Sequence, residues 1–192
     1  MEQGAQVVVV GGGAAGLMAA GQAAAAGAQV LVLERTARLG TKLRITGKGR
    51  CNLTNMAELD RFLVHFAFLG SEGDTRFFLR NAFARFFAPD LVAFFEGLDV
   101  ATVVERGERV FPASNDAHQV AEALVRFAHQ QGAQIQMQSR VQDLLCQEGQ
   151  IRGVLLGGGQ RIAAEAVIVA TGGASYPKTG SSGDGYRLAQ EV

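Results

Sequence analysis

The sequence has few of the features that mark secreted, metal-binding or membrane-spanning chains. Its 192 residues include only 2 cysteines, which form neither a disulfide framework nor a paired metal-ligand spacing. No basic leader precedes an apolar segment, and no apolar run approaches the roughly 18 residues that a membrane span needs. The formal net charge is +0, so no overall field attracts nucleic acid or an anionic membrane. These absences favour a reduced, cytoplasmic location without a membrane partner, and the length suits one domain.

The N-terminal region predicts a strand–helix–strand unit. Residues 5–10 are continuous and apolar, as expected for a parallel strand that is covered on both faces. The alanine-rich residues 14–26 predict a helix that ends at Gly27. Residues 29–34 predict a second parallel strand, so the unit is a right-handed βαβ crossover in an α/β fold.

The turn after the first strand carries the spacing G-x-G-x-x-G. Gly11 suits a tight turn, Gly13 leaves room for a pyrophosphate, and Gly16 lets the helix pack close to the sheet. Glu34 ends the second strand at about the 20-residue offset at which an acid binds ribose hydroxyls. An acid at this position also disfavours the 2′-phosphate of NADP, because like charges repel. The alternative for Glu34 is a solvated acid at a strand end.

The middle of the chain changes in composition. Residues 35–57 predict an extended, glycine-punctuated loop, and residues 58–97 predict a helical, phenylalanine-rich insertion. One helical face there is expected to be filled by five side chains, namely Phe78, Ala82, Phe83, Phe86 and Phe87. An aromatic face of this kind is more often core than cofactor site.

The second half predicts further strands around one helix. A hairpin is expected at residues 100–111, followed by a helix that is capped by residues 114–116 and ends at Gly132. The remaining strands are expected at about 133–138, 140–146, 151–156 and 161–170. The final run of the last strand, residues 166–170, is expected to be fully buried and leads into Thr-Gly-Gly.

Three longer motifs bring the whole chain close to one family. They are Gly-Lys-Gly-Arg-Cys-Asn-Leu-Thr-Asn at 47–55, Glu-Arg-Val-Phe-Pro-Ala-Ser at 108–114 and Gly-Gly-Ala-Ser-Tyr-Pro-Lys-Thr-Gly at 172–180. With the late Ala-Thr-Gly strand, this set resembles the HI0933-like flavoproteins, which are NAD(P)/FAD-dependent, aminoacetone oxidase-like oxidoreductases. The resemblance implies a Rossmann-like FAD-binding domain of the two-dinucleotide-binding flavoprotein type.

The resemblance also implies roles for individual residues toward FAD. The pyrophosphate is expected on the backbone of Gly11, Gly13, Ala14, Ala15 and Gly16, with the ribose on Glu34. A loop along the flavin nucleotide is expected to contain Arg35, Thr41, Lys42, Gly49, Arg50, Cys51 and Asn52. Val141 is expected to present its backbone to adenine, and the segment passing the flavin is Ala170, Thr171, Gly172 and Gly173. Asp184, in a Gly-Asp-Gly turn, is expected to be either a helix cap or a site residue.

Members of the family are about twice as long as this chain. The resemblance therefore implies that residues 1–192 form the N-terminal part of the FAD-binding domain, without the substrate domain and the C-terminal FAD segment. The expected activity is hydride transfer through flavin N5 between NAD(P)H or a small-molecule substrate and an acceptor. Because no second glycine motif is present, any NAD(P)H is expected to bind transiently at the flavin face.

Two other functions remain open at this level. One alternative is that the chain is a catalytically inactive nucleotide-binding remnant. The other is a flavoenzyme that acts on an RNA base, suggested by a basic run without acids that comprises Arg35, Arg38, Lys42, Arg44, Lys48 and Arg50. The balanced overall charge ranks this RNA hypothesis below a small-molecule substrate.

Overall fold

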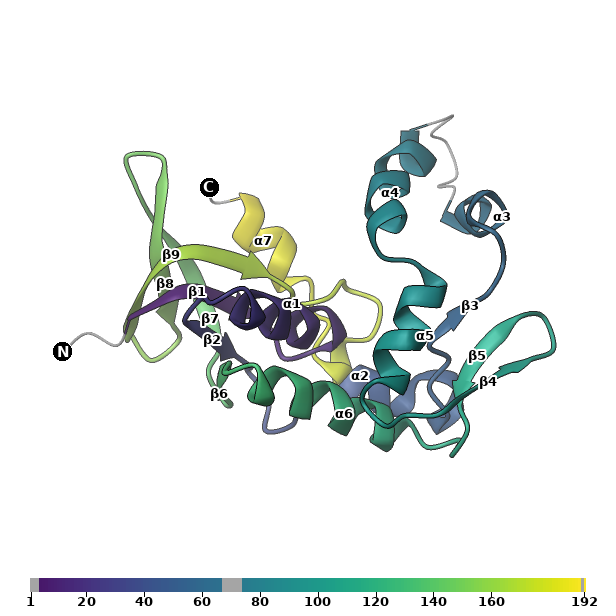
Figure 1. Ribbon diagram of the computed structural model, residues 1–192. Helices are drawn as coiled ribbons and strands as arrows, with labels where there is room; N and C mark the ends of the chain where they lie inside the picture. Colours follow the sequence, from purple (N-terminus) through teal and green to yellow (C-terminus); the bar gives the residue numbers. More distant parts are fainter. Residues whose placement is uncertain (1–3, 67–73, 191) are drawn as a thin grey trace. The chain divides into compact units, whose positions relative to one another are not determined.

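The structure is a computed structural model that describes residues 4–66, 74–190 and 192. The chain divides into two compact units (Figure 1). The first unit comprises residues 1–44 and 124–192, and the second comprises residues 45–123. The described residues contain no helix that is both long enough and apolar enough to cross a membrane.

The first unit is built on a six-stranded sheet with the order β6-β2-β1-β9-β8-β7. Strands β6, β2, β1 and β9 are parallel, while β8 and β7 continue the sheet in antiparallel fashion. The bounds are β1 Gly4–Val10, β2 Val30–Leu33, β6 Gln134–Gln136, β7 Val141–Gln147, β8 Gln150–Leu156 and β9 Arg161–Val169. The expected parallel βαβ unit and the later strands are therefore confirmed.

Helix α1 (Ala14–Ala25) packs against β1, β2 and β9. Its small residues allow close contact, and a Cβ on Gly21 would lie 2.2 Å from the Phe127 ring of α6 (Ala117–Gln130). Helix α7 (Asp184–Gln190) contacts β7, and its Leu188 belongs to the same buried cluster as Val8 and Ile162. The apolar sequence of β1 is explained by this arrangement, because Val8 and Val9 are both fully buried.

The last strand differs from expectation. Ile168 is 36% exposed and Val169 is 39% exposed, so the prediction that residues 166–170 are fully buried is wrong. Strand β9 pairs with β1 as far as Val169, but β8 pairs with it only at Arg161, Ile162 and Ala163. The end of β9 nearest the glycine turn therefore has one paired edge among the described residues.

The second unit contains a three-stranded antiparallel sheet with the order β3-β5-β4. The strands are β3 Thr54–Asn55, β4 Thr102–Glu105 and β5 Arg109–Pro112, so the expected hairpin is confirmed. Its helices are α3 Leu59–Leu63, α4 Asp74–Arg85 and α5 Ala88–Glu96. The start of α6 is capped as expected, because the Asp116 carboxylate accepts a hydrogen bond from His118 N–H at 2.8 Å.

The phenylalanine-rich segment is helical, but its expected apolar face is only partly formed. Phe78 is 81% exposed and Phe86 is 40% exposed, which corrects the prediction that both fill one buried face. Helix α4 ends at Arg85, so Phe86 and Phe87 do not continue its face. The rings of Phe62 and Phe83 instead stack edge to face at 5.4 Å, with Phe66 and Phe87 beside them. Residues 67–73 of this segment lie outside the described part.

The prediction of an extended loop over residues 35–57 is also wrong in part. This segment contains α2 (Thr41–Ile45), the 3₁₀ turn η1 (Thr46–Gly49) and strand β3.

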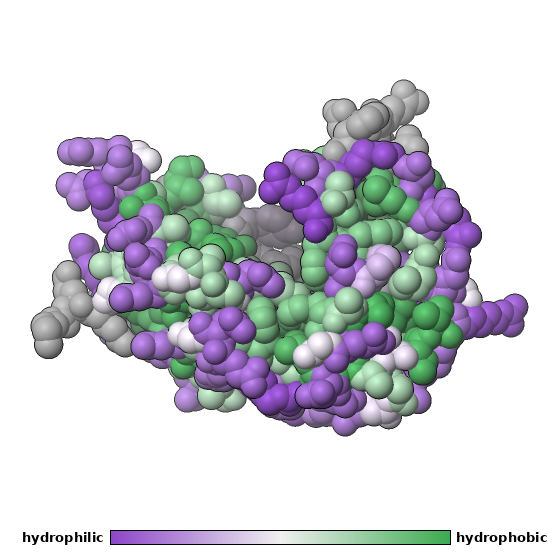
Figure 2. Space-filling model, viewed as in Figure 1, coloured by the Kyte–Doolittle hydropathy of each residue, from purple (hydrophilic) through white to green (hydrophobic). Residues whose placement is uncertain are grey.

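Figure 2 shows that apolar residues also reach the surface between polar ones, and Ile45 and Val104 are more than half exposed. A second 3₁₀ turn, η2 (Val64–Phe66), and a third, η3 (Pro177–Thr179), complete the described elements.

Candidate functional site: a dinucleotide cradle

The glycine turn after β1 is held by close backbone contacts. Gly11 has φ +109°, and a Cβ there would lie 2.6 Å from the Ala170 carbonyl oxygen. A Cβ on Gly16 would lie 1.8 Å from the Gly11 carbonyl oxygen, so no larger residue fits without a shift. Gly13 has the ordinary extended angles φ −85° and ψ −171°, and its Cβ position has no atom within 4 Å. Of these three glycines, Gly11 and Gly16 are therefore tightly packed against backbone, and Gly13 is open.

The opening at Gly13 coincides with the N-terminus of α1. Gly13 is the N-cap, no side chain caps the helix there, and its first turn contains no acidic residue. The first N–H groups of a helix lack partners within the helix and carry partial positive charge. The adjoining residues Ala14 and Ala15 are exposed and small, so an anionic group can reach these N–H groups.

Glu34 closes the other side of this turn. Its carboxylate accepts hydrogen bonds from Gly12 N–H (2.7 Å, Oε2) and Thr36 N–H (2.7 Å, Oε1). A Cβ on Gly12 would lie 2.4 Å from Leu39 Cδ2 and 3.2 Å from Glu34 Cβ, so a larger residue there would have to displace the Leu39 side chain. A carboxylate has about four acceptor positions. Glu34 can therefore hold the turn and still accept hydroxyl groups from a ligand.

The end of β9 lies directly beside the glycine turn. Ala170 N–H donates to the Val10 carbonyl at 2.9 Å, and the next residue, Thr171, approaches the Cβ position of Gly11 to 3.2 Å. Thr171 Oγ1 is buried and has no hydrogen-bond partner among the described residues. Gly172 has φ +76°, and the Gly173 carbonyl accepts a hydrogen bond from Gly183 N–H at 3.2 Å. An unpartnered buried hydroxyl next to an open turn is consistent with a site that a ligand completes.

Other expected cofactor residues of the first unit contact neighbouring residues of the same unit. Arg35 donates to Ser182 Oγ at 2.8 Å and pairs with Asp184 at 3.0 Å. Thr41 Oγ1 donates to the Arg38 carbonyl at 3.1 Å, and Lys42 Nζ lies 5.6 Å from the centroid of the Tyr176 ring. The side chain of Val141 is buried in the core, at 4% exposure. The expected contact of its backbone with adenine stays a prediction.

Gly49, Arg50, Cys51 and Asn52 belong to the second unit. There Arg50 Nε donates to Asn115 Oδ1 at 2.6 Å, and the guanidinium pairs with Glu105 and lies 4.2 Å from the Phe111 ring centroid. This engagement gives Arg50 a structural role within its own unit. The expected role of these four residues toward a flavin stays a prediction.

The Arg50–Glu105 pair predicts an acid-sensitive stability. The hydrogen bond from Arg50 lowers the pKa of Glu105 below its ordinary value of 4.5. A lowered pKa in the folded state adds stability above the unfolded value, and this stability is lost as the pH falls through the folded pKa. We expect Arg50→Gln to lower stability in urea at pH 7, with the difference from wild type shrinking below pH 4.5. Arg106→Gln, in the same hairpin, serves as the charge control, and a difference that is constant with pH would contradict this interpretation.

Cys51 is a packed thiol, as expected from the sequence. It is 1% exposed, and burial raises the pKa of its thiol to about 11, so it is neutral near pH 7. We expect iodoacetamide at pH 8 to alkylate the exposed Cys146 in the folded chain and Cys51 only in urea, because the thiolate is the reactive form. Peptide mass spectrometry measures both sites. Rapid native labelling of Cys51 would show that the thiol is activated instead.

Three residues of this arrangement were not found from the sequence. Gly12 lies within the recognised glycine run, but nothing in the spacing indicates that its N–H binds Glu34. Thr36 and Ser182 contribute a backbone N–H and a hydroxyl, which give no local sequence signal. Among the described residues, no three His, Cys, Asp or Glu side chains are grouped so that they could hold a metal ion.

The sequence is similar to one protein family model and to several characterised proteins. Residues 5–192 match the model of the HI0933-like protein Rossmann domain. The 3-dehydro-bile acid delta(4,6)-reductase of Clostridium scindens is 36% identical over 166 residues, which are 86% of this chain and 38% of that protein. The ribosomal RNA dihydrouridine synthase of Escherichia coli is 28% identical over 170 residues, covering 88% of this chain and 40% of that protein. The chain thus spans less than half the length of these relatives.

Solved structures show the same fold. A flavocytochrome c3 fumarate reductase matches with a TM-score of 0.65 and 24% identity, covering 98% of this chain and 40% of that one. The 3-ketosteroid-delta4-(5alpha)-dehydrogenase of Rhodococcus jostii RHA1 matches with a TM-score of 0.63 and 21% identity, covering 91% of this chain and 47% of that one. The expected α/β Rossmann fold is confirmed by these matches.

Proposed function

The chain belongs to the HI0933-like family, and from this premise we propose that it forms the FAD-binding portion of an FAD-dependent oxidoreductase. The observation that carries the proposal is the open, uncapped N-terminus of α1 at Gly13, set beside the Glu34 carboxylate. An ADP group needs these two features together, because its pyrophosphate is anionic and its ribose donates hydroxyl hydrogen bonds. The unpartnered hydroxyl of Thr171 lies at the same end of the sheet.

The chain's own residues have binding and positioning roles in this proposal. The backbone N–H groups at Gly13, Ala14 and Ala15 bind the pyrophosphate, and Glu34 accepts the ribose hydroxyls. Thr171, Gly172 and Gly173 bring the backbone past the flavin end. FAD supplies hydride transfer through its N5, with NAD(P)H as a transient donor and a small-molecule substrate or acceptor as partner.

Nucleotide competition tests the proposal on the chain as it stands. We expect FAD to bind, as followed by quenching of flavin fluorescence, and ADP to displace it. FMN lacks the adenosine and one phosphate, so we expect it to compete poorly. A chain that takes up neither FAD nor ADP would contradict the proposal, whereas binding without NAD(P)H oxidation above that of free flavin would support the inactive-remnant alternative.

A flavoenzyme acting on an RNA base is the second candidate, because one group of relatives carries the name ribosomal RNA dihydrouridine synthase. The structure weakens the argument from the basic run. Arg35 pairs with Asp184, Arg50 pairs with Glu105, and Arg44 is 9% exposed with its Nε donating to the Leu39 carbonyl. RNA affinity that falls steeply with salt would favour this candidate. Absence of binding at low ionic strength would exclude it for this chain.

A further inference from the structure

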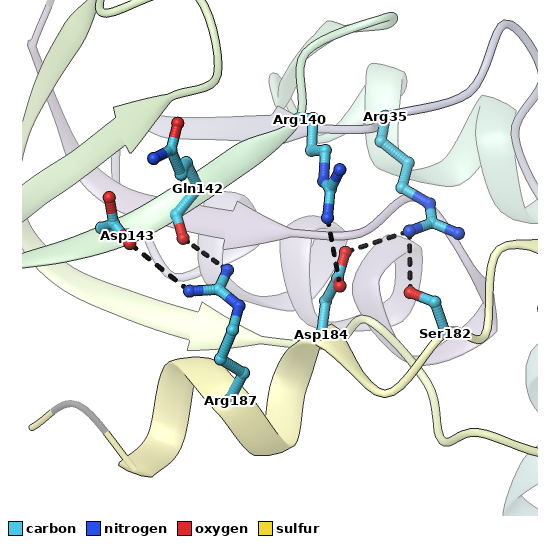
Figure 3. A network of polar contacts seen from close by, with 7 residues as sticks. All are labelled: Arg35, Arg140, Gln142, Asp143, Ser182, Asp184 and Arg187. Atoms are coloured by element: carbon cyan, nitrogen blue, oxygen red, sulfur yellow. Dashed lines mark hydrogen bonds and ion pairs between the residues drawn. The ribbon is translucent and has the colours of Figure 1, made fainter.

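A cluster of ion pairs joins three distant segments at one end of the sheet in the first unit (Figure 3). Asp184, the first residue of α7, has a side chain that is 16% exposed. Its Oδ2 pairs with Arg35 at 3.0 Å and its Oδ1 with Arg140 at 3.4 Å. Arg35 also donates to Ser182 Oγ at 2.8 Å, so one guanidinium binds two residues of the same turn.

This cluster fixes the segment 171–183, which we call the strap because it connects β9 to α7. The two ends of the strap are joined by a hydrogen bond, in which Gly183 N–H donates to the Gly173 carbonyl at 3.2 Å. In the middle of the strap, the Cβ position of Gly180 lies 3.9 Å from Arg35 Nε and 4.0 Å from Thr36. The strap therefore lies against the residues that directly follow Glu34.

The two sides of the candidate cofactor site are linked through these contacts. Glu34 holds Gly12 and Thr36 through its carboxylate, and its neighbour Arg35 holds Ser182 and Asp184. Gly183, which precedes Asp184, then donates its N–H to the carbonyl of Gly173, and Gly173 belongs to the segment that follows Thr171. A Cβ on Gly185 would lie 2.5 Å from Thr171 Oγ1, so the first turn of α7 packs directly on this residue.

We propose that Asp184 is a positioning residue for the dinucleotide site: by holding Arg35, it sets the distance between the Glu34 corner and the Thr171–Gly173 segment. The proposal rests on the proposed function, because it concerns how the same site is shaped. Both oxygens of the Asp184 carboxylate pair with arginines, so this residue has a tertiary role beyond the helix cap that the sequence allowed. A ligand that spans both sides then binds to a site that is already assembled, which avoids the cost of ordering it.

The chain offers a matched control on the same helix. Arg187 Nη1 pairs with Asp143 at 3.4 Å, and its other terminal nitrogen donates to the Gln142 carbonyl. These contacts hold α7 to β7 but do not involve Arg35 or the strap. Arg187→Gln therefore tests the attachment of α7 without the link to Glu34.

A double-mutant cycle on FAD affinity tests the proposal. We expect Asp184→Asn and Arg35→Gln each to weaken FAD binding about tenfold. The double variant is expected to bind FAD little worse than either single variant, because the same Asp184–Arg35 pair is broken in all three. Asp184→Glu is expected to recover part of the affinity. Arg187→Gln is expected to bind FAD as wild type does, even where it lowers thermal stability.

Hydrogen exchange of the strap gives an independent readout. Amides of residues 172–183 are expected to exchange faster in Asp184→Asn than in Arg187→Gln. If the wild-type chain binds FAD and Asp184→Asn binds it equally well, or if the two substitutions act additively, the positioning role is wrong. A wild-type chain that binds no FAD overturns the proposed function itself, so the two failures are distinguishable.

Discussion

Replacing Gly13 by alanine is expected to weaken FAD binding strongly while the fold keeps its stability. The backbone at Gly13 is extended, with φ −85°, and nothing lies within 4 Å of the Cβ position, so alanine fits the ligand-free chain. Stability is expected to change by less than about 1 kcal/mol, because the gain from a more restricted unfolded chain is offset by the weaker preference of alanine for the N-cap position. The added methyl group occupies the space through which the pyrophosphate reaches the helix N-terminus. Overpacking of about 1–3 kcal/mol corresponds to about 5- to 150-fold weaker binding.

Gly16→Ala is the matched comparison for Gly13→Ala, because it places the same methyl group at a tightly packed position of the same turn. Its Cβ would lie 1.8 Å from the Gly11 carbonyl oxygen, so the turn has to shift. We expect this variant to lose about 1–3 kcal/mol of stability, and FAD binding with it. Urea unfolding and FAD titration of both variants separate the two effects. If Gly13→Ala binds FAD like wild type, the pyrophosphate does not approach at Gly13.

Glu34→Gln is expected to impair both the turn and the binding of FAD. The carboxylate accepts two backbone N–H groups at 2.7 Å, whereas an amide offers one oxygen and turns its NH₂ group toward the second N–H. Leaving one partly buried N–H without an acceptor costs about 1–3 kcal/mol. The ribose hydroxyls also lose a charged acceptor, so FAD affinity is expected to fall by about tenfold or more.

Glu165→Gln is the matched control for this substitution, because Glu165 is an exposed acid on β9 of the same unit. It is expected to leave both stability and FAD affinity unchanged. The two measurements are urea unfolding without ligand and FAD titration. Loss of stability in Glu34→Gln with unchanged FAD affinity would assign the carboxylate to the turn alone and contradict its role toward ribose.

Local sequence patterns predicted the strand–glycine–helix unit well, because the apolar run and the glycine spacing that indicate it lie within a few residues. The valines of β1 form a strand because both faces are covered, and Gly11 and Gly16 are required by contacts within the turn and with the neighbouring strand. The hairpin around Gly107 and the cap at Asp116 also follow from short-range preferences. The long family motifs added the expectation of a flavin, which no local pattern contains.

Other expectations failed because they depended on what each face packs against. Phe78 has the helical spacing of a core residue, yet it is 81% exposed because the aromatic cluster forms around Phe62 and Phe83 instead. Ile168 and Val169 continue an apolar strand, yet they are partly exposed at the end of β9 that lies beyond its pairing with β8. For Arg50, the basic and glycine-rich context gives no sign that the guanidinium pairs with Glu105, and its expected role toward a flavin stays a prediction.

The sequence by itself determined the parallel βαβ unit and the glycines at its turn, because a continuous apolar run and a glycine spacing are properties of neighbouring residues. Only the tertiary structure decided that Glu34 binds Gly12 and Thr36, and that Asp184 binds Arg35. The Asp184–Arg35 pair joins residues far apart in the chain, so it exists only once the segment after β2 and the start of α7 have come together. Which charged residues are free for a ligand and which are used by the protein itself is therefore a property of the folded chain.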